Sequence, residues 1–177
     1  ENKKSFKINP NSHGDYNSLV GELINDENVP VKIVHLWGVT GNGKSENGTP
    51  GAHAKPLIES IDNDLDNGFY SLFNLARAIG NHSLNANMEI EVVTDNMQEI
   101  TGQEKLNPGK STILGPVRVI PKEYFNIKCR CIDIASNGWE ASGRIDEDEM
   151  VKRLTREFSS EISDPVIAYR GRFRWLQ

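Results

Sequence analysis

The chain has 177 residues, a formal net charge of -5 and a sequence pI near 5.4. This length lets one domain bury a core without disulfides or metals, so we expect residues 1–177 to form a single domain. The acidic balance excludes a broad nucleic-acid surface, because phosphate binding requires concentrated Lys and Arg. No apolar run approaches the roughly 20 residues of a membrane span, and no signal-peptide pattern opens the sequence. The chain begins at Glu1 without Met, which suggests an excised or processed piece.

The two cysteines, Cys129 and Cys131, are two positions apart. On a strand they would point to the same face, where they are poorly placed to bridge each other. We therefore expect reduced thiols and a cytoplasmic location, because disulfides are rare in the cytosol.

The first predicted elements are a short strand around Phe6 to Ile8 and a helix from about Asp15 to Asn25, which has apolar residues at helical spacing. The near-continuous apolar run from Val31 to Trp37 predicts a central parallel strand that is buried on both faces of a sheet. The segment from Gly38 to Pro56 holds five Gly and two Pro, so it is predicted to be a loop.

Helix-like and strand-like spacing alternate along the rest of the chain, with Gly80 as a helix stop and Asn107-Pro108 as a helix start. We predict, in chain order, a helix at about Asp66 to Ile79, a strand at Glu89 to Thr94, a helical segment at about Asn107 to Ile120, a strand at Lys128 to Ile134, a helix at Asp146 to Phe158, and strands at Pro165 to Tyr169 and Phe173 to Leu176. The alternation is typical of βαβ units. The expected fold class is therefore α/β, with a Rossmann-like, doubly wound, mostly parallel sheet flanked by helices.

The residues from Gly38 to Ser45 match the G-x-x-x-x-G-K-[ST] pattern of a phosphate-binding loop, which gives an alternative function for the chain. Such a loop leads directly into a helix whose N-terminus is electropositive. Here the stretch from Glu46 to Gly51 disfavours a helix and carries a carboxylate where a phosphate would lie. Asp95, after a predicted strand, is the one acid that could be proposed as a magnesium ligand. A P-loop nucleotide-binding protein is therefore the alternative hypothesis.

A second pattern, Tyr124-x-x-x-Lys128 with Ser111 thirteen positions before the tyrosine, resembles the catalytic Ser, Tyr and Lys of short-chain dehydrogenases. That chemistry requires Tyr and Lys one helical turn apart, facing a bound nicotinamide. Pro121 precedes the pattern, a β-rich run follows it, and the chain has no G-x-G-x-x-G turn. We therefore expect Lys128 to begin a strand, and a free-standing reductase is disfavoured.

The four histidines are not spaced like metal ligands, since none lies four residues from another or from a cysteine. His35 falls within a predicted strand, where we expect a hydrogen-bonded core residue. The acidic run from Asp146 to Glu149 is expected in the first turn of an exposed helix. We predict no catalytic, cofactor-binding or metal-binding residue in this chain.

Four longer phrases carry a more specific resemblance. They are VKIVHLWGVTG from Val31, LDNGFYSLFNLARAIG from Leu65, EIEVVTDNMQEITGQEKLNPGKSTILGPVRVIPKEYFNIKCRCIDI from Glu89, and VIAYRGRFRWLQ from Val166. From about Phe6 to Gln177, the chain resembles the structural, N-terminal, noncatalytic subdomain of ketoreductases in modular type I polyketide synthases.

The resemblance implies a truncated Rossmann-like fold that has lost cofactor binding and braces a second, catalytic half. In the family, that half binds NADPH and reduces a β-ketoacyl thioester carried on an acyl carrier protein. The chain is thus expected to be an inactive scaffold within a larger oxidoreductase, with no cofactor of its own. Its implied partners are the catalytic ketoreductase subdomain and neighbouring polyketide synthase domains, with no role for nucleic acid or membrane.

Two further expectations follow from the resemblance. Family members usually have another strand and helix before the segment equivalent to Phe6, so an edge of the sheet is expected to be exposed or covered by another polypeptide. The C-terminal strand is expected to lead into the partner half, so burial across the interface should occur there. Arg and aromatic side chains, which this strand contains, are also enriched at interfaces. The candidate interface residues are Tyr169, Arg170, Arg172, Phe173, Arg174 and Trp175.

Overall fold

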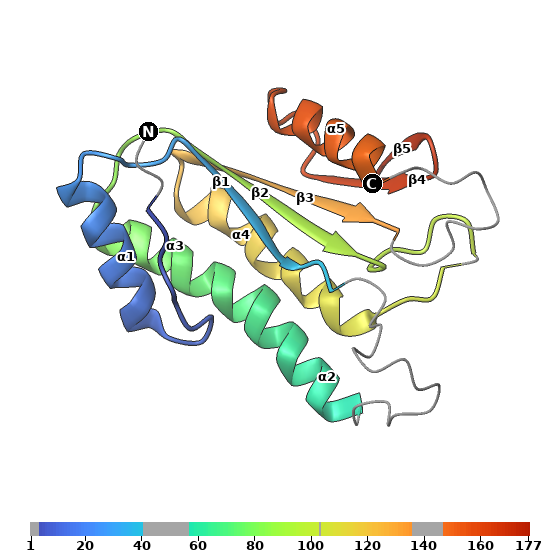
Figure 1. Cartoon of the computed structure of the whole chain (residues 1–177), viewed down its shortest axis with the longest axis horizontal. Helices are drawn as coiled ribbons and strands as arrows, with labels where there is room; N and C mark the ends of the chain where they lie inside the picture. Colours follow the sequence, from blue (N-terminus) through green and yellow to red (C-terminus); the bar gives the residue numbers. More distant parts are fainter. Residues whose placement is uncertain (1–3, 41–56, 103, 136–146) are drawn as a thin grey trace.

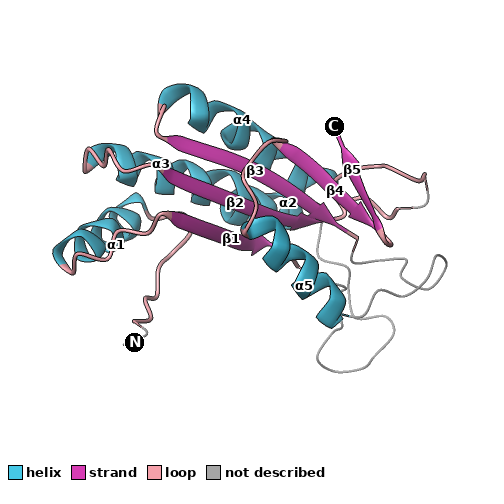
Figure 2. Cartoon of the chain, turned by 90° about the horizontal axis from the view of Figure 1, so that it is seen from above, coloured by secondary structure: helices cyan, strands magenta, loops and turns pink. Residues whose placement is uncertain are grey.

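The computed structural model describes residues 4–40, 57–102, 104–135 and 147–177. They form a five-stranded sheet with a layer of helices on one face and α5 on the other (Figures 1 and 2). The helices are α1 (His13–Asn25), α2 (Leu57–Asp64), the π-helical η1 (Leu65–Tyr70), α3 (Ser71–Asn81), the 3-10 helix η2 (Pro108–Ile113), α4 (Leu114–Glu123) and α5 (Glu147–Phe158). The strands are β1 (Lys32–Gly38), β2 (Met88–Asp95), β3 (Ile127–Ile134), β4 (Val166–Arg170) and β5 (Phe173–Leu176).

The strands lie in sequential order from β1 to β5, and all neighbours are parallel except β4 and β5, which form an antiparallel hairpin. Parallel neighbours require a crossover, and helices supply it between β1, β2, β3 and β4. The main core lies between the sheet and helices α1, α3 and α4, and a smaller core lies beneath α5. The predicted α/β class, a mostly parallel Rossmann-like sheet flanked by helices, is confirmed.

Among the described strands, β1 is an edge strand, so the prediction of a central strand buried on both faces is wrong. His35 is 8% exposed beneath the helical layer, but Val34 and Leu36 on the other face are 40% and 51% exposed. Those two side chains lie on the α5 side of the sheet, and α5 packs over β3 and β4 instead. An apolar run predicts a strand, but it cannot tell whether a neighbouring strand or helix covers it.

The segment before α1 is not a strand, contrary to the prediction for Phe6 to Ile8. Ile8 packs against the main core, and the backbone N of Asn9 donates to Asp15 Oδ2 at 2.9 Å. These contacts lead the chain directly into α1, whose N-cap Ser12 side chain accepts a hydrogen bond from the backbone N of Asp15. The helix predicted from about Asp15 to Asn25 is confirmed, with a start two residues earlier.

Helices α2, η1 and α3 follow one another without a break, so this helix begins at Leu57, before the predicted start at Asp66. It also continues through Gly80, which is therefore not a stop. The glycine is required by packing, because a Cβ at this position would lie 2.6 Å from Tyr124 Cε1. The predicted apolar face is largely buried, but Phe73 is 44% exposed.

The later elements agree closely with the predictions. Asn107 caps η2 by accepting a hydrogen bond from the backbone N of Gly109 at 3.2 Å, and Pro108 is the first helical residue, as expected. Lys128 is the second residue of β3, and β5 has the predicted bounds. The acidic first turn of α5 begins at Glu147, while Asp146 lies outside the described residues.

Candidate functional site

Open α/β sheets bind ligands outside the carboxyl ends of their parallel strands, so this edge of the sheet is where a site is expected. At this edge Asp95, the last residue of β2, forms an ion pair with Lys110 of η2. Lys110 Nζ also donates to Thr40 Oγ1 at 2.7 Å, two residues beyond the end of β1. The two charged side chains are 0% and 4% exposed, so neither charge faces solvent.

Asp64 lies buried at the end of α2, close to this ion pair. Burial raises the pKa of Asp64, whereas a hydrogen bond with Asn107 and the charge of Lys110 act in the opposite direction. The backbone of η2 packs tightly here, because a Cβ on Gly109 would lie 2.7 Å from Asp64 Oδ2. The end of α2, η2 and the strand ends are thus packed as one unit.

A second buried ion pair lies at the same edge, beside β3 and β4. Arg170 Nη2 donates to Asp133 Oδ2 at 2.6 Å, and Arg170 Nε donates to Glu104 Oε1 at 3.0 Å. Two backbone N–H groups of the loop after β2 also donate to Asp133. Burial acts to raise the pKa of Glu104, but hydrogen bonds from Thr101 and Arg170 outweigh it and lower the pKa to about 2.

Among the described residues, the carboxyl edge is therefore closed by charged side chains of the chain itself. Breaking a buried ion pair is costly because it leaves a charge without a partner, so both pairs hold the loops over the strand ends. The described strands also follow one sequential order, and the reversal of strand order that forms a nucleotide crevice does not occur among them. This arrangement fixes the loops over the strand ends.

A third charged network joins α5 to the opposite face of the sheet. Arg130 of β3 is 0% exposed and donates Nε and Nη2 to the two carboxylate oxygens of Glu91, at 2.8 and 2.6 Å. Its Nη1 donates to Glu157 Oε2 at 2.8 Å, and Glu157 Oε1 accepts from Tyr169 OH at 2.7 Å and from Arg174 Nε at 2.5 Å. This bidentate geometry satisfies the buried guanidinium and fixes α5 on the sheet.

The outer surface of the helical layer carries exposed apolar side chains. Phe73 of α3 and Val119 of α4 are 44% and 49% exposed. Phe73 stacks on Phe69 with ring centroids 6.3 Å apart, and Arg77 Cζ lies 5.5 Å from the centroid of the Phe73 ring. Phe69 reaches α4, because a Cβ on Gly115 would lie 3.5 Å from Phe69 Cε2. We call Phe69, Phe73, Arg77 and Val119 the helical patch.

The six residues predicted for the subdomain interface lie on β4, on β5 and in the turn between them. Tyr169 and Arg170 are buried within this chain, where they bond to Glu157 and Asp133. The exposed members are Arg172, Phe173, Arg174 and Trp175. The interface itself remains a prediction, and its exposed part is the outer strand of the hairpin.

The two exposed aromatic residues of the hairpin point to the side of the helical layer. In the antiparallel pairing Arg174 lies opposite Tyr169, which packs beneath α5. Because side chains alternate along a strand, Phe173 and Trp175 point to the other side. Arg118 of α4 donates to the side chain of the C-terminal residue at 2.8 Å, which joins the hairpin to the helical layer. The helical patch and the hairpin aromatics therefore share one side of the molecule.

The Ser, Tyr and Lys of the dehydrogenase-like pattern do not assemble into a catalytic site. Tyr124 packs against Gly80 of α3, whereas Lys128 is exposed on β3 and pairs with Glu161 at 2.9 Å. Ser111 lies in η2, before the opposite end of α4, and donates to the carbonyl oxygen of Pro108 at 2.7 Å. Residues 41–45 of the phosphate-loop pattern and the following residues to Pro56 lie outside the described residues.

The prediction for His35 is confirmed, since its Nε2 lies 2.7 Å from Ser71 Oγ in the core. Burial lowers the pKa of His35 to about 4. Cys129 and Cys131 are free and buried, and burial raises the pKa of Cys129 to about 12, which makes an unreactive thiol. In the described part of the chain, no three His, Cys, Asp or Glu side chains are grouped to hold a metal ion, and no helix is long and apolar enough to cross a membrane.

Sequence reasoning missed Lys110 and the role of Asp133. An acid directly after or within a buried strand is a signal that a cation must pair with it. That signal was present in Val93-Thr94-Asp95 and in Ile132-Asp133. The sequence does not identify the cation that pairs with each acid, because Lys110 is 15 residues from Asp95 and Arg170 is 37 residues from Asp133.

Residues 1–153 match the family described as beta-ketoacyl synthase-like, N-terminal, and the chain belongs to this family. No curated protein matches the sequence.

Similar solved structures include two that contain ketoreductases. One is a multidomain structure with adenylation, ketoreductase and pseudo-Asub domains from a keto acid-selecting NRPS module, with a TM-score of 0.75, 20% identity and 96% of this chain covered. The other is an N-terminal ketoreductase from the macrolactin assembly line, with a TM-score of 0.68, 18% identity and 100% coverage. This chain spans 13% and 33% of those two chains. A short-chain dehydrogenase/reductase from Vibrio parahaemolyticus has a TM-score of 0.58 at 15% identity, with 91% of this chain and 74% of that chain covered.

At these identities the likeness establishes the fold. The chain has the Rossmann-like fold of short-chain dehydrogenases and of ketoreductase-containing modules, so the predicted resemblance to a ketoreductase structural subdomain is confirmed at the level of the fold.

Proposed function

We propose that the chain is the noncatalytic scaffold half of a polyketide synthase ketoreductase in the cytoplasm. In this proposal it braces a separate catalytic half, which binds NADPH and reduces β-ketoacyl thioesters on an acyl carrier protein. The chain itself binds no cofactor, and its partners are the catalytic half and neighbouring synthase domains.

The observation that carries this proposal is the closed carboxyl edge of the sheet. Lys110 with Asp95, and Arg170 with Asp133, bury their charges where a nucleotide-binding relative of this fold would hold its ligand. A cofactor entering there would have to displace two buried ion pairs, which is strongly unfavourable. The chain keeps the Rossmann-like fold, but buried ion pairs occupy the edge of the sheet where such a fold binds nucleotides. This combination supports a structural role.

The shared side of the helical patch and the hairpin supports contact with a partner domain. Exposed aromatic residues, each with an arginine beside its ring, are typical of the centre of protein interfaces. Arg77 lies over Phe73, and Arg172 Cζ lies 5.2 Å from the centroid of the Phe173 ring. The catalytic half would therefore pack against α3, α4 and β5.

Two nucleotide titrations test the inactive-scaffold claim. We expect no saturable change in NADPH fluorescence when NADPH is titrated with the purified chain, and no heat of binding for Mg-ATP. Saturable NADPH binding by the chain alone would overturn the proposal. Micromolar Mg-ATP binding that disappears in Lys44→Ala would instead establish the phosphate-loop alternative.

Substitution in the complete ketoreductase tests the partner surface. Phe73→Ala and Trp175→Ala should each lower the thermal stability and the ketoreductase activity of the two-half protein, because aromatic residues dominate interface energies. Phe125→Ala is the matched control, since Phe125 is 94% exposed and lies between α4 and β3, outside both surfaces. Equal behaviour of all three variants would refute the proposed contact surface.

A further inference from the structure

A recess of about 440 Å³ lies between α5 and the β4–β5 hairpin, on the side of the sheet that carries α5. Its lining includes three arginines, Arg153 and Arg156 of α5 and Arg172 of the hairpin turn. Glu157 and Tyr169 form part of its floor. This recess lies on the opposite side of the sheet from the helical patch, and it shares Tyr169 and Arg172 with the predicted interface residues.

The acidic side chains of the recess are already paired. Both carboxylate oxygens of Glu157 accept hydrogen bonds, from Arg130 and Arg174 and from Tyr169 OH. Glu149 Oε1 accepts from Arg153 Nε at 3.1 Å. The local charge, counting these ion pairs, is therefore positive within a chain whose net charge is -5.

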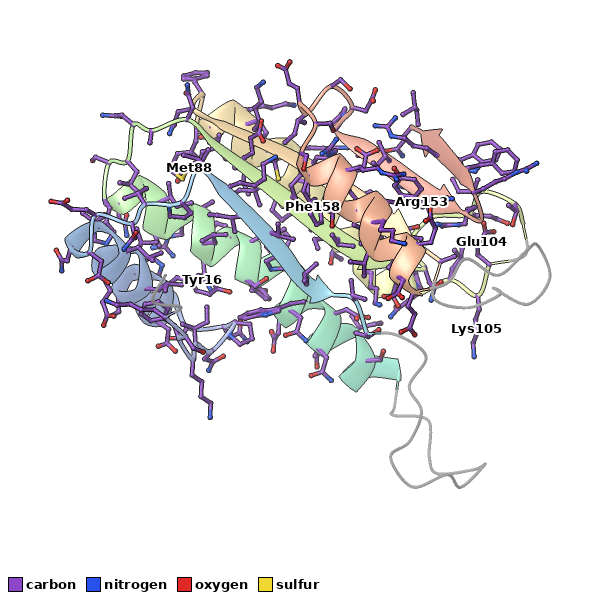
Figure 3. The ribbon with its side chains drawn as sticks, turned by 45° about the horizontal axis from the view of Figure 1, so that its top comes forward. Tyr16, Met88, Glu104, Lys105, Arg153 and Phe158 are labelled. Atoms are coloured by element: carbon purple, nitrogen blue, oxygen red, sulfur yellow. The ribbon has the colours of Figure 1, made fainter. Side chains whose placement is uncertain are left out.

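One of the three arginines is held in position. Arg153 also donates Nη1 to the carbonyl oxygen of Gly171 at 3.1 Å, so α5 and the hairpin turn fix its guanidinium between them (Figure 3). Its side chain is only 18% exposed. A guanidinium held this way loses little side-chain freedom when it binds an anion.

The other two arginines have no acidic partner among the residues that the structure describes. The side chain of Arg156 makes no hydrogen bond or ion pair with another described residue, and among those residues the Arg172 guanidinium contacts the Phe173 ring. They come from different elements, α5 and the turn, and both line the recess. A guanidinium group binds carboxylate or phosphate oxygens through paired N–H groups. Several guanidinium groups around one recess therefore favour a ligand with several charged oxygens.

We propose that this recess binds a phosphate group, as a phosphate ester or diphosphate on a small molecule. Arg156 and Arg172 contact the phosphate oxygens, while Arg153 lies beneath them as a fixed positive charge. A phosphate dianion offers three acceptor oxygens to these arginines, whereas a carboxylate offers two oxygens and one charge. The site goes beyond the proposed scaffold function, since this chain's own residues would bind the phosphate without the catalytic half; Arg172 belongs both to this site and to the predicted partner surface.

Titration of the purified chain with pyrophosphate, at constant ionic strength and followed by two-dimensional NMR, tests the proposal. We expect saturable shifts confined to α5 and the hairpin turn. Arg156→Gln and Arg172→Gln should each weaken binding about tenfold, the loss of one charge-assisted contact. Arg77→Gln is the matched control, because it removes the same charge from the helical patch and should bind pyrophosphate normally.

Three outcomes would overturn the proposal. They are the absence of saturable shifts, an equal loss of binding in Arg77→Gln, which would indicate a net-charge effect, and succinate binding as tight as pyrophosphate. Nucleotide binding at the carboxyl edge would shift Lys110 and its neighbours instead, so failure here and failure of the scaffold proposal are distinguishable.

Discussion

Protonation of His35 should destabilise the fold between pH 7 and pH 5. Ser71 Oγ donates to the carbonyl oxygen of Asn67 at 2.5 Å, so it must accept a hydrogen bond from His35 Nε2–H. The neutral ring therefore carries its proton on Nε2. His35 Nδ1 is buried with no hydrogen-bond partner in the described part of the chain, so a second proton would meet only the residue's own backbone.

The expected magnitude follows from the pKa of this histidine. Burial lowers the pKa from 6.5 to about 4 in the folded chain, against a smaller opposing effect of the residue's own backbone. The unfolded chain therefore binds the proton first, and stability that is present above pH 6.5 is lost as the pH falls towards 4. At about 1.4 kcal/mol per tenfold change, the loss is about 2 kcal/mol at pH 5 and about 3 kcal/mol below pH 4.

Urea unfolding at pH 7, 6 and 5 measures this loss, with Trp37 fluorescence as the signal because its ring lies 5.8 Å from His35. His35→Gln should remove about 2 kcal/mol of the difference in unfolding free energy between pH 7 and pH 5. Arg77→Gln is the control and should keep the pH dependence of the wild type, because an arginine stays charged throughout this pH range. An unchanged pH dependence in His35→Gln would refute the assignment of this proton.

Three further predictions concern the core. Arg130→Met should lower the unfolding free energy by about 3–5 kcal/mol, because the buried Glu91 loses its bidentate partner and Glu157 loses one of its two arginines. Lys128→Met, on the same strand but exposed, should have little effect in the same urea titration. Gly80→Ala should cost about 1–3 kcal/mol through overpacking against Tyr124, and a double-mutant cycle with Tyr124→Leu should recover most of that cost; full additivity would contradict the contact. The two cysteines should react with a thiol reagent only after unfolding, and fast labelling of the native chain would contradict their burial.

The sequence predicted the elements that depend on local signals and failed where the outcome depends on distant neighbours. Asn107-Pro108 and the alternating run of β5 are local signals, and both were placed correctly. Val31 to Trp37 has the composition of a central strand, but its position in the sheet is decided by which strands pair with it. Glycine often ends helices, which predicts a stop at Gly80, but in the fold Gly80 makes room for the ring of Tyr124, 44 residues later.

The candidate site shows the same division. His35 in the core and Lys128 at the start of a strand follow from the local pattern, and both are confirmed. The ion pairs of Lys110 with Asp95 and of Arg170 with Asp133 depend on how loops cross the strand ends. The spacing of apolar residues in the sequence carries no information about those loop paths. Buried charges within apolar strands indicated that partners must exist, but the partners became known only from the fold.

The position of β1 also sets the order in which the sheet opens. Strands β2 and β3 are hydrogen-bonded to a neighbour on each side, whereas β1 is bonded only to β2 among the described strands. The amide protons of β2 and β3 should therefore exchange with solvent only through large-scale unfolding, while those of β1 exchange through local fraying. Stability thus decreases across the sheet towards β1, and a measured gradient of exchange rates would map that decrease strand by strand.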